Sequence, residues 1–262
     1  MKALHFKPTL GLLFIGTALL LPAIAQAQKL PNVQKAAVYA AGPIKIDGKA
    51  VELNHKFQAY NKATDCFYTL SNDDTNLYLT VQIKLSEITS KVLMGGMTLT
   101  ISPARDKKDI SGMQITFPLF EGADRSSITN RFARKVNEMR AAKGKDIDAT
   151  DLNKASISFS KTIRVKGIGA NAEETISVYN EQGIKAVAQF DQQLQYTYEL
   201  QLPLKQIKAL KAGITSFKYN VQVNPPEIKP YEPGDGPPPP PMLNTTLSTT
   251  DFWGEYTLAK KP

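Results

Sequence analysis

The sequence predicts an all-β protein: an antiparallel, jelly-roll-like β-sandwich with one inserted amphipathic helix, a short late helix and a proline-rich loop. Apolar and polar residues alternate over many short segments, which is the period-two pattern of half-buried strands. Turn-forming pairs such as Asp47-Gly48 separate these segments. Short strands with frequent turns are typical of sandwiches built from antiparallel sheets.

The clearest strand is predicted from Leu77 to Leu85, where every second residue is leucine, valine or isoleucine. The turn-rich segment 72–76 joins it to a preceding strand at 66–70, so the two predict a β-hairpin. Cys66, the only cysteine, is expected to be buried in that strand, and no internal disulfide is possible. The same alternation predicts strands at 97–101, 113–117, 157–159, 176–178, 184–190, 196–202, 217–223 and 252–258.

Three segments depart from the strand pattern. An amphipathic helix is predicted at about 126–143, followed by a polar loop, so that the helical insert spans about 126–154. Its apolar residues recur at helical spacing, as Ile128, Phe132, Val136 and Met139. Pro203 is expected to open a shorter helix that Gly213 closes. Residues 225–241 contain nine prolines in seventeen residues, which predicts an exposed loop of polyproline II character.

Residues 1–27 have the order of a secretory signal peptide: early lysines, an apolar run, and small residues at the end. Cleavage is expected between Ala27 and Gln28, which leaves one domain at 28–262 in the periplasm or outside the cell. Removal of two lysines, Lys2 and Lys7, and of no acidic residue lowers the net charge from +8 to +6. Scattered lysines on an exported protein argue against nucleic acid as a partner, and the short apolar run argues against a membrane span. A monomer is expected.

Three blocks in order resemble carbohydrate-binding module family 9 and its DOMON-like sandwich relatives. They are an opening strand and Asp-Gly turn at 44–49, the hairpin at 68–81, and the late strand at 196–204, with a closing aromatic strand at Phe252-Trp253. The resemblance implies a secreted β-sandwich that binds a saccharide without catalysis. It also implies that aromatic side chains clamp the sugar.

Aromatic residues are therefore the candidates for saccharide contact: Trp253, Tyr78, Tyr60 and Tyr231. Tyr78 is on the polar face of its predicted strand and is expected to be available. Asp73 and Asp74 offer hard oxygen ligands for a structural calcium ion, which some relatives hold. The alternative for these acids is an Asx turn, whose side chains bond their own backbone. No other cofactor is expected.

Two further functions stay open from the residues alone. The protein could be a structural or interaction component of the cell envelope, with the proline-rich loop and the helical insert as its docking surface. It could instead be a glycan-active enzyme whose carboxylate pair is not visible in sequence. His55 is the only histidine after residue 27, and neither a nucleophile elbow nor the ligand spacing of a zinc site is present. We therefore expect a non-catalytic protein.

Overall fold

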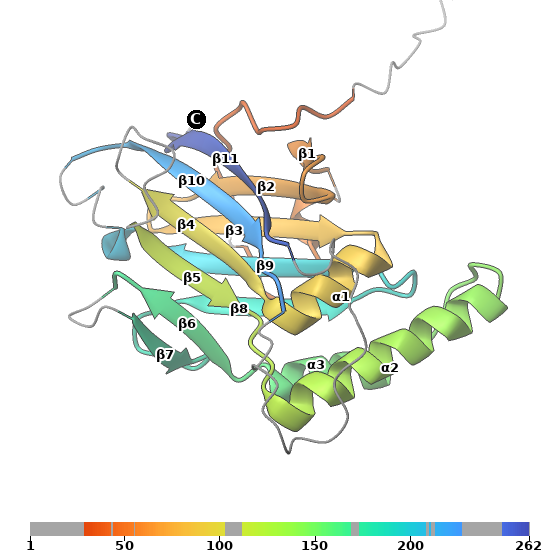
Figure 1. The fold of residues 1–262 in the computed structure, drawn as a ribbon. Helices are drawn as coiled ribbons and strands as arrows, with labels where there is room; N and C mark the ends of the chain where they lie inside the picture. Colours follow the sequence, from red (N-terminus) through yellow and green to blue (C-terminus); the bar gives the residue numbers. More distant parts are fainter. Residues whose placement is uncertain are drawn as a thin grey trace, which may run out of the picture.

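The computed structural model is a β-sandwich with its helices gathered at one end (Figure 1). It describes residues 29–42, 44–54, 56–102, 112–168, 173–207, 210, 213–226 and 248–261. One sheet, sheet A, has five strands in the order β1-β2-β3-β9-β8, and the other, sheet B, has six in the order β11-β10-β4-β5-β6-β7. Neighbouring strands in both sheets are antiparallel, which confirms the predicted fold class.

The strands are short, as the turn spacing predicts. Sheet A consists of β1 (Ala59–Asn61), β2 (Cys66–Asn72), β3 (Asn76–Ile83), β8 (Lys185–Phe190) and β9 (Tyr196–Pro203). Sheet B consists of β4 (Met97–Ser102), β5 (Met113–Phe117), β6 (Thr162–Lys166), β7 (Glu173–Ser177), β10 (Ser216–Val223) and β11 (Thr250–Thr257). The strands β1 and β6 were not predicted: β1 has only three residues, and β6 alternates over only five, with Ile163 and Val165 as its apolar residues.

The predicted hairpin is present as β2 and β3, with Phe67 opposite Gln82. Every second residue of the hairpin points between the two sheets and joins the hydrophobic core. The members of this core are found along the chain from Ala59 to Tyr256. Cys66 is fully buried at the start of β2, as expected, and burial raises the pKa of its thiol to about 12.

The helices differ most from prediction. They are α1 (Ser86–Gly95), α2 (Gly122–Ala141) and α3 (Thr150–Phe159), with single 3-10 turns η1 (Val51–Leu53) and η2 (Leu204–Gln206). The predicted insert helix is α2, which begins at Gly122 rather than at Ser126. The helix α1 was not predicted. Within the described ranges, no helix is both long and apolar enough to cross a bilayer.

Residues 150–159 form a helix where a loop and a strand were predicted. The sequence predicted the end of a loop and then a strand at 157–159, because Ile157 and Phe159 alternate. The segment is instead the helix α3, which buries Leu152, Ala155 and Ser156 at helical spacing. Two alternating residues are too few to distinguish a strand from the end of a helix.

The predicted late helix is only partly described. Pro203 ends β9, and the chain then forms the 3-10 turn η2 rather than an α-helix at that point. Residues 208, 209, 211 and 212 lie outside the described residues, as do residues 227–247 with most of the proline-rich loop. The signal peptide and its cleavage site are outside them as well.

Candidate functional site

The outer face of sheet A is hollowed by two adjoining cavities that share Gln82 and Asp191. The larger, which we call the aromatic groove, has a volume of about 540 Å³. It is lined by Leu30, Lys56, Phe57, Phe67, Gln82, Lys84, Asp191 and Gln195. The smaller has about 380 Å³ and is bounded by the loop 48–51, the start of α3 and the ends of β8 and β9. Together they form one depression across the sheet.

Aromatic side chains form one wall of the groove. Phe67 points outward from β2, and its cross-strand partner Tyr60 packs beside it with ring centroids 4.7 Å apart. Phe57 contacts the same ring at 6.1 Å between centroids. The Lys84 Nζ lies 4.6 Å from the Phe67 ring centroid, in a cation–π contact. Phe67 is thus a partly exposed ring held in place by three neighbours.

The Tyr60 hydroxyl is fixed beside the groove. It donates a 2.6 Å hydrogen bond to Asp65 Oδ1, and this bond holds the pKa of Tyr60 above its ordinary value. The tyrosine ring therefore supports Phe67 from a defined position.

Polar groups line the rest of the groove. Gln82 is 6% exposed, and its Nε2 donates to Thr197 Oγ1 at 3.4 Å. Asp191 Oδ1 accepts hydrogen bonds from the backbone N–H groups of Gln193 and Gln195, at 2.9 and 2.8 Å. Amide and carboxylate groups at set positions beside an aromatic ring are suited to a ligand that has both an apolar face and hydroxyl groups.

A buried glutamate holds the loop that borders the smaller cavity. Glu199 in β9 is 1% exposed, and its carboxylate accepts the backbone N–H groups of Asp47, Gly48 and Ala50 at 2.9, 2.7 and 3.2 Å. Burial raises the pKa of Glu199, while the three donors oppose that shift. Two of the sequence blocks, 44–49 and 196–204, therefore meet in this contact.

Gly48 allows the loop to lie close to sheet A. Its φ is +78°, and a Cβ there would be 2.9 Å from the backbone nitrogen of Gln189. Both conditions favour glycine, since other residues rarely adopt this φ and have no room for a side chain. The Asp47-Gly48 turn therefore reverses the chain and also packs directly against sheet A.

The structure does not gather the predicted aromatic residues into one site. Tyr60 supports the aromatic groove on sheet A, whereas Trp253 is half-buried on β11, at the edge of sheet B. Tyr78 was expected to be available, and this is wrong: it is 4% exposed and donates a 2.6 Å hydrogen bond to Asp73 Oδ2. Tyr231 lies outside the described residues.

The turn with Asp73 and Asp74 is held together by its own hydrogen bonds. Asp73 Oδ1 accepts the backbone N–H groups of Thr75 and Asn76, both at 2.7 Å. Burial raises the pKa of Asp73, but the bonds from Tyr78, Thr75 and Asn76 hold it below its ordinary value. Asp74 is exposed. In the described part of the chain, no group of three or more His, Cys, Asp or Glu residues is placed to hold a metal ion, and calcium at this turn stays a prediction.

Phe67, Gln82 and Lys84 were not predicted as site residues from the sequence. A signal was available, because the predicted hairpin places residue 67 and residue 82 on the same outer face. Phe67 stands between the inward residues Cys66 and Tyr68, so alternation alone assigns its side chain to that face. The aromatic candidates predicted from the sequence are all tyrosine or tryptophan, and Phe67 is not among them.

Comparisons with known proteins identify one distant structural neighbour. It is a carbohydrate-binding module of family 9 from Caldicellulosiruptor kristjanssonii in complex with glucose, with a TM-score of 0.37 and 10% sequence identity over 87% of this chain and 97% of that chain. That module belongs to the family that the three sequence blocks resemble. No family model and no curated protein matches the chain. At this distance the likeness does not transfer a ligand, and the site is defined by its own geometry.

Proposed function

We propose that this protein is an exported, non-catalytic saccharide-binding protein, and that the aromatic groove is its binding site. The observation that carries the proposal is the partly exposed Phe67 ring, which is flanked by Lys84 and lies in one cavity with Gln82, Asp191 and Gln195. Sugars pack their C–H faces on aromatic rings, and their hydroxyl groups bond to amides and charged groups at the rim.

The charges at the groove favour acidic saccharides. Among the lining residues, Lys56 and Lys84 supply two ammonium groups against the single carboxylate of Asp191. Asp191 Oδ1 already accepts two backbone hydrogen bonds, so less of its charge faces a ligand. A saccharide with a carboxylate or sulfate group is therefore expected to bind more tightly than its neutral counterpart. This difference should shrink at high salt.

A glycan array with the purified mature protein identifies the ligand, and calorimetry on a positive glycan then tests the groove. Phe67→Leu retains apolar volume but removes the aromatic face. We expect it to weaken binding about five-fold to ten-fold, because one aromatic contact contributes roughly 1 kcal/mol. Lys84→Gln should weaken the binding of an acidic glycan more than the binding of a neutral one.

Trp253→Ala is the matched control, because that side chain is on the other sheet. Unchanged affinity in this variant and reduced affinity in Phe67→Leu support the groove. The reverse pattern would move the site to sheet B, and no glycan binding at all would remove the proposed function.

Export is tested separately. The N-terminus of exported material should be Gln28, because Ala25 and Ala27 suit the small-residue pockets of a signal peptidase. Intact-mass and N-terminal peptide measurements on the exported fraction check this. Retention of residues 1–27 there would contradict the proposed localisation.

A further inference from the structure

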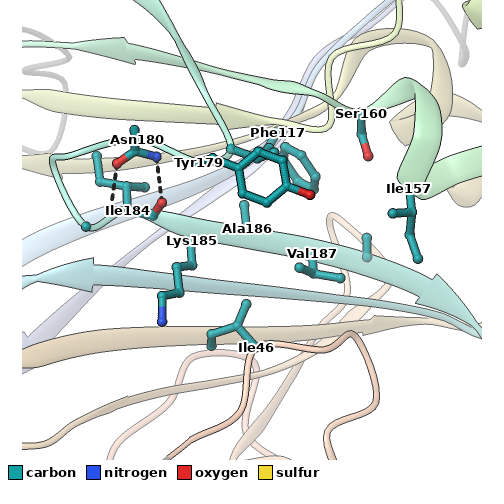
Figure 2. Close-up of a pocket in the computed structure, with 13 residues that line it drawn as sticks. Ile46, Phe117, Ile157, Ser160, Tyr179, Asn180, Ile184, Lys185, Ala186 and Val187 are labelled. Carbon is teal, nitrogen blue, oxygen red and sulfur yellow. Dashed lines mark hydrogen bonds between the residues drawn. The ribbon is translucent and has the colours of Figure 1, made fainter.

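The strand β8 is at the edge of sheet A, and two asparagine side chains cover the ends of its free side. Asn180 Nδ2 donates to the Ile184 carbonyl at 2.8 Å, and the Ile184 N–H donates to Asn180 Oδ1 at 3.1 Å (Figure 2). Asn153 forms the same pair of bonds with Phe190, at 2.8 and 2.7 Å. Each amide thus supplies the two hydrogen bonds that a neighbouring strand would form.

The residues between these two positions have no neighbouring strand on their free side. In an antiparallel strand, every second residue directs its N–H and C=O to the same side. Ile184 and Phe190 direct theirs away from β9, so Ala186 and Ala188 do so as well. Within the described residues, neither alanine has a hydrogen bond on that side. Each alanine is 5% exposed, counting main chain and side chain together, and both residues line a cavity.

A cavity of about 370 Å³ runs along this free edge. All residues from Gly183 to Ala188 line it, and successive side chains of a strand point to opposite faces, so the cavity follows the edge rather than one face. Figure 2 shows Phe117 and Tyr179 on one side of the strand and Ile46 on the other. Tyr179 is 92% exposed and Ile157 is 51% exposed, so apolar surface is open at the rim.

The charge at the cavity limits what can occupy it. Lys185 is the one charged side chain among the described residues that line the cavity, and it is exposed. Its ammonium group has no carboxylate within ion-pair distance among the described residues. An occupant with a carboxylate beside Lys185 is therefore favoured. Edge-to-edge pairing with a second copy, centred on Val187, would place Lys185 opposite a glutamine, Gln189 of that copy, and supply no such charge.

We propose that the β8 edge binds a short extended peptide segment of a partner protein as an added antiparallel strand. The peptide places apolar residues opposite Ala186 and Ala188, where they enter the cavity. It places an acidic residue opposite Lys185. Main-chain hydrogen bonds supply the register and the side chains supply the specificity, as in other strand-addition interfaces. This site is separate from the aromatic groove and does not depend on saccharide binding.

The probe is the blocked peptide Ac-Val-Thr-Val-Glu-NH2, titrated into the mature protein and followed by amide NMR. The signals of Ala186 and Ala188 should shift and their hydrogen exchange should slow. N-methylation of either valine removes an N–H that faces β8 and should weaken binding at least ten-fold. N-methylation of the threonine removes an N–H that faces away, so this control peptide should bind as before. Equal binding of all methylated peptides would overturn the proposal.

A charge exchange provides the second test. Lys185→Glu should weaken binding of the peptide that ends in glutamate at least five-fold, and it should strengthen binding of the same peptide ending in lysine. Lys260→Glu should change the binding of neither peptide. Both results support the proposal. Sedimentation that shows the protein dimerising through this edge would replace the peptide with a second copy. A saccharide that shifts Ala186 and Ala188 in place of the peptide would also overturn it.

Discussion

Glu199→Ala is expected to lower the free energy of unfolding by about 3–5 kcal/mol, because it leaves several buried donors without acceptors. In the native protein the Glu199 carboxylate accepts the backbone N–H groups of Asp47, Gly48 and Ala50. The last two residues are buried, so water cannot easily replace the lost acceptor. The loop 44–54 should detach from sheet A before the sandwich itself unfolds.

Urea denaturation measures the loss, and hydrogen exchange of the Gly48 and Ala50 amides reports the local opening. Glu181→Ala is the matched control, since Glu181 is exposed and its replacement should stay within about 0.5 kcal/mol of wild type. A Glu199→Ala protein as stable as the Glu181→Ala control would show that the loop is held by other contacts.

The same carboxylate should make stability depend on pH. Burial raises the pKa of Glu199 above its ordinary value of 4.5, so the folded protein binds this proton more tightly than the unfolded chain does. The resulting contribution to stability is fully present below the unfolded pKa and is lost as pH rises through the folded pKa. Glu199→Gln should remove this part of the dependence, which denaturation series at several pH values would detect.

Gly254→Ala is expected to have the second large effect. It should lower the free energy of unfolding by about 2–3 kcal/mol, which is the upper part of the range for overpacking a core. Gly254 pairs with Tyr219 across β10 and β11, and a Cβ would lie 2.3 Å from Tyr219 Cζ. That ring cannot easily move. Tyr219 is fully buried, its hydroxyl is 3.0 Å from the Tyr68 hydroxyl, and Phe252 packs against it edge-on.

A double-mutant cycle tests this cause. In a Tyr219→Leu background, Gly254→Ala should cost less than about 1 kcal/mol, because the two sites are directly coupled. Gly42→Ala is the control, since a Cβ there meets nothing within 4 Å. An equal cost of Gly254→Ala in both backgrounds would assign the effect to the backbone of β11 rather than to the tyrosine ring.

The alternation of apolar and polar residues predicted those elements in which it continues over many residues. The hairpin of β2 and β3 has many alternating residues, and its register follows from them. The helix α3 was not predicted, because Ile157 and Phe159 alternate like strand residues when they are considered alone. The helix depends instead on packing against β8 and α2. The prediction that Tyr78 is exposed was wrong for a related reason. Alternation correctly assigned it to the outer face, but residues from other strands and the Asp73 turn enclose it there.

The sequence by itself determined the sandwich class, the main hairpin and the burial of Cys66, because alternation and turn chemistry act between near neighbours. Only the tertiary structure decided that Glu199 holds the Asp47-Gly48 turn, 151 residues away at Gly48. It also decided that Phe67, Gln82 and Gln195 share a groove, and that Ala186 and Ala188 lie on a sheet edge that faces a cavity and has no neighbouring strand. These features depend on which strands become neighbours, and the order of strands in a sheet has no local signal in the chain.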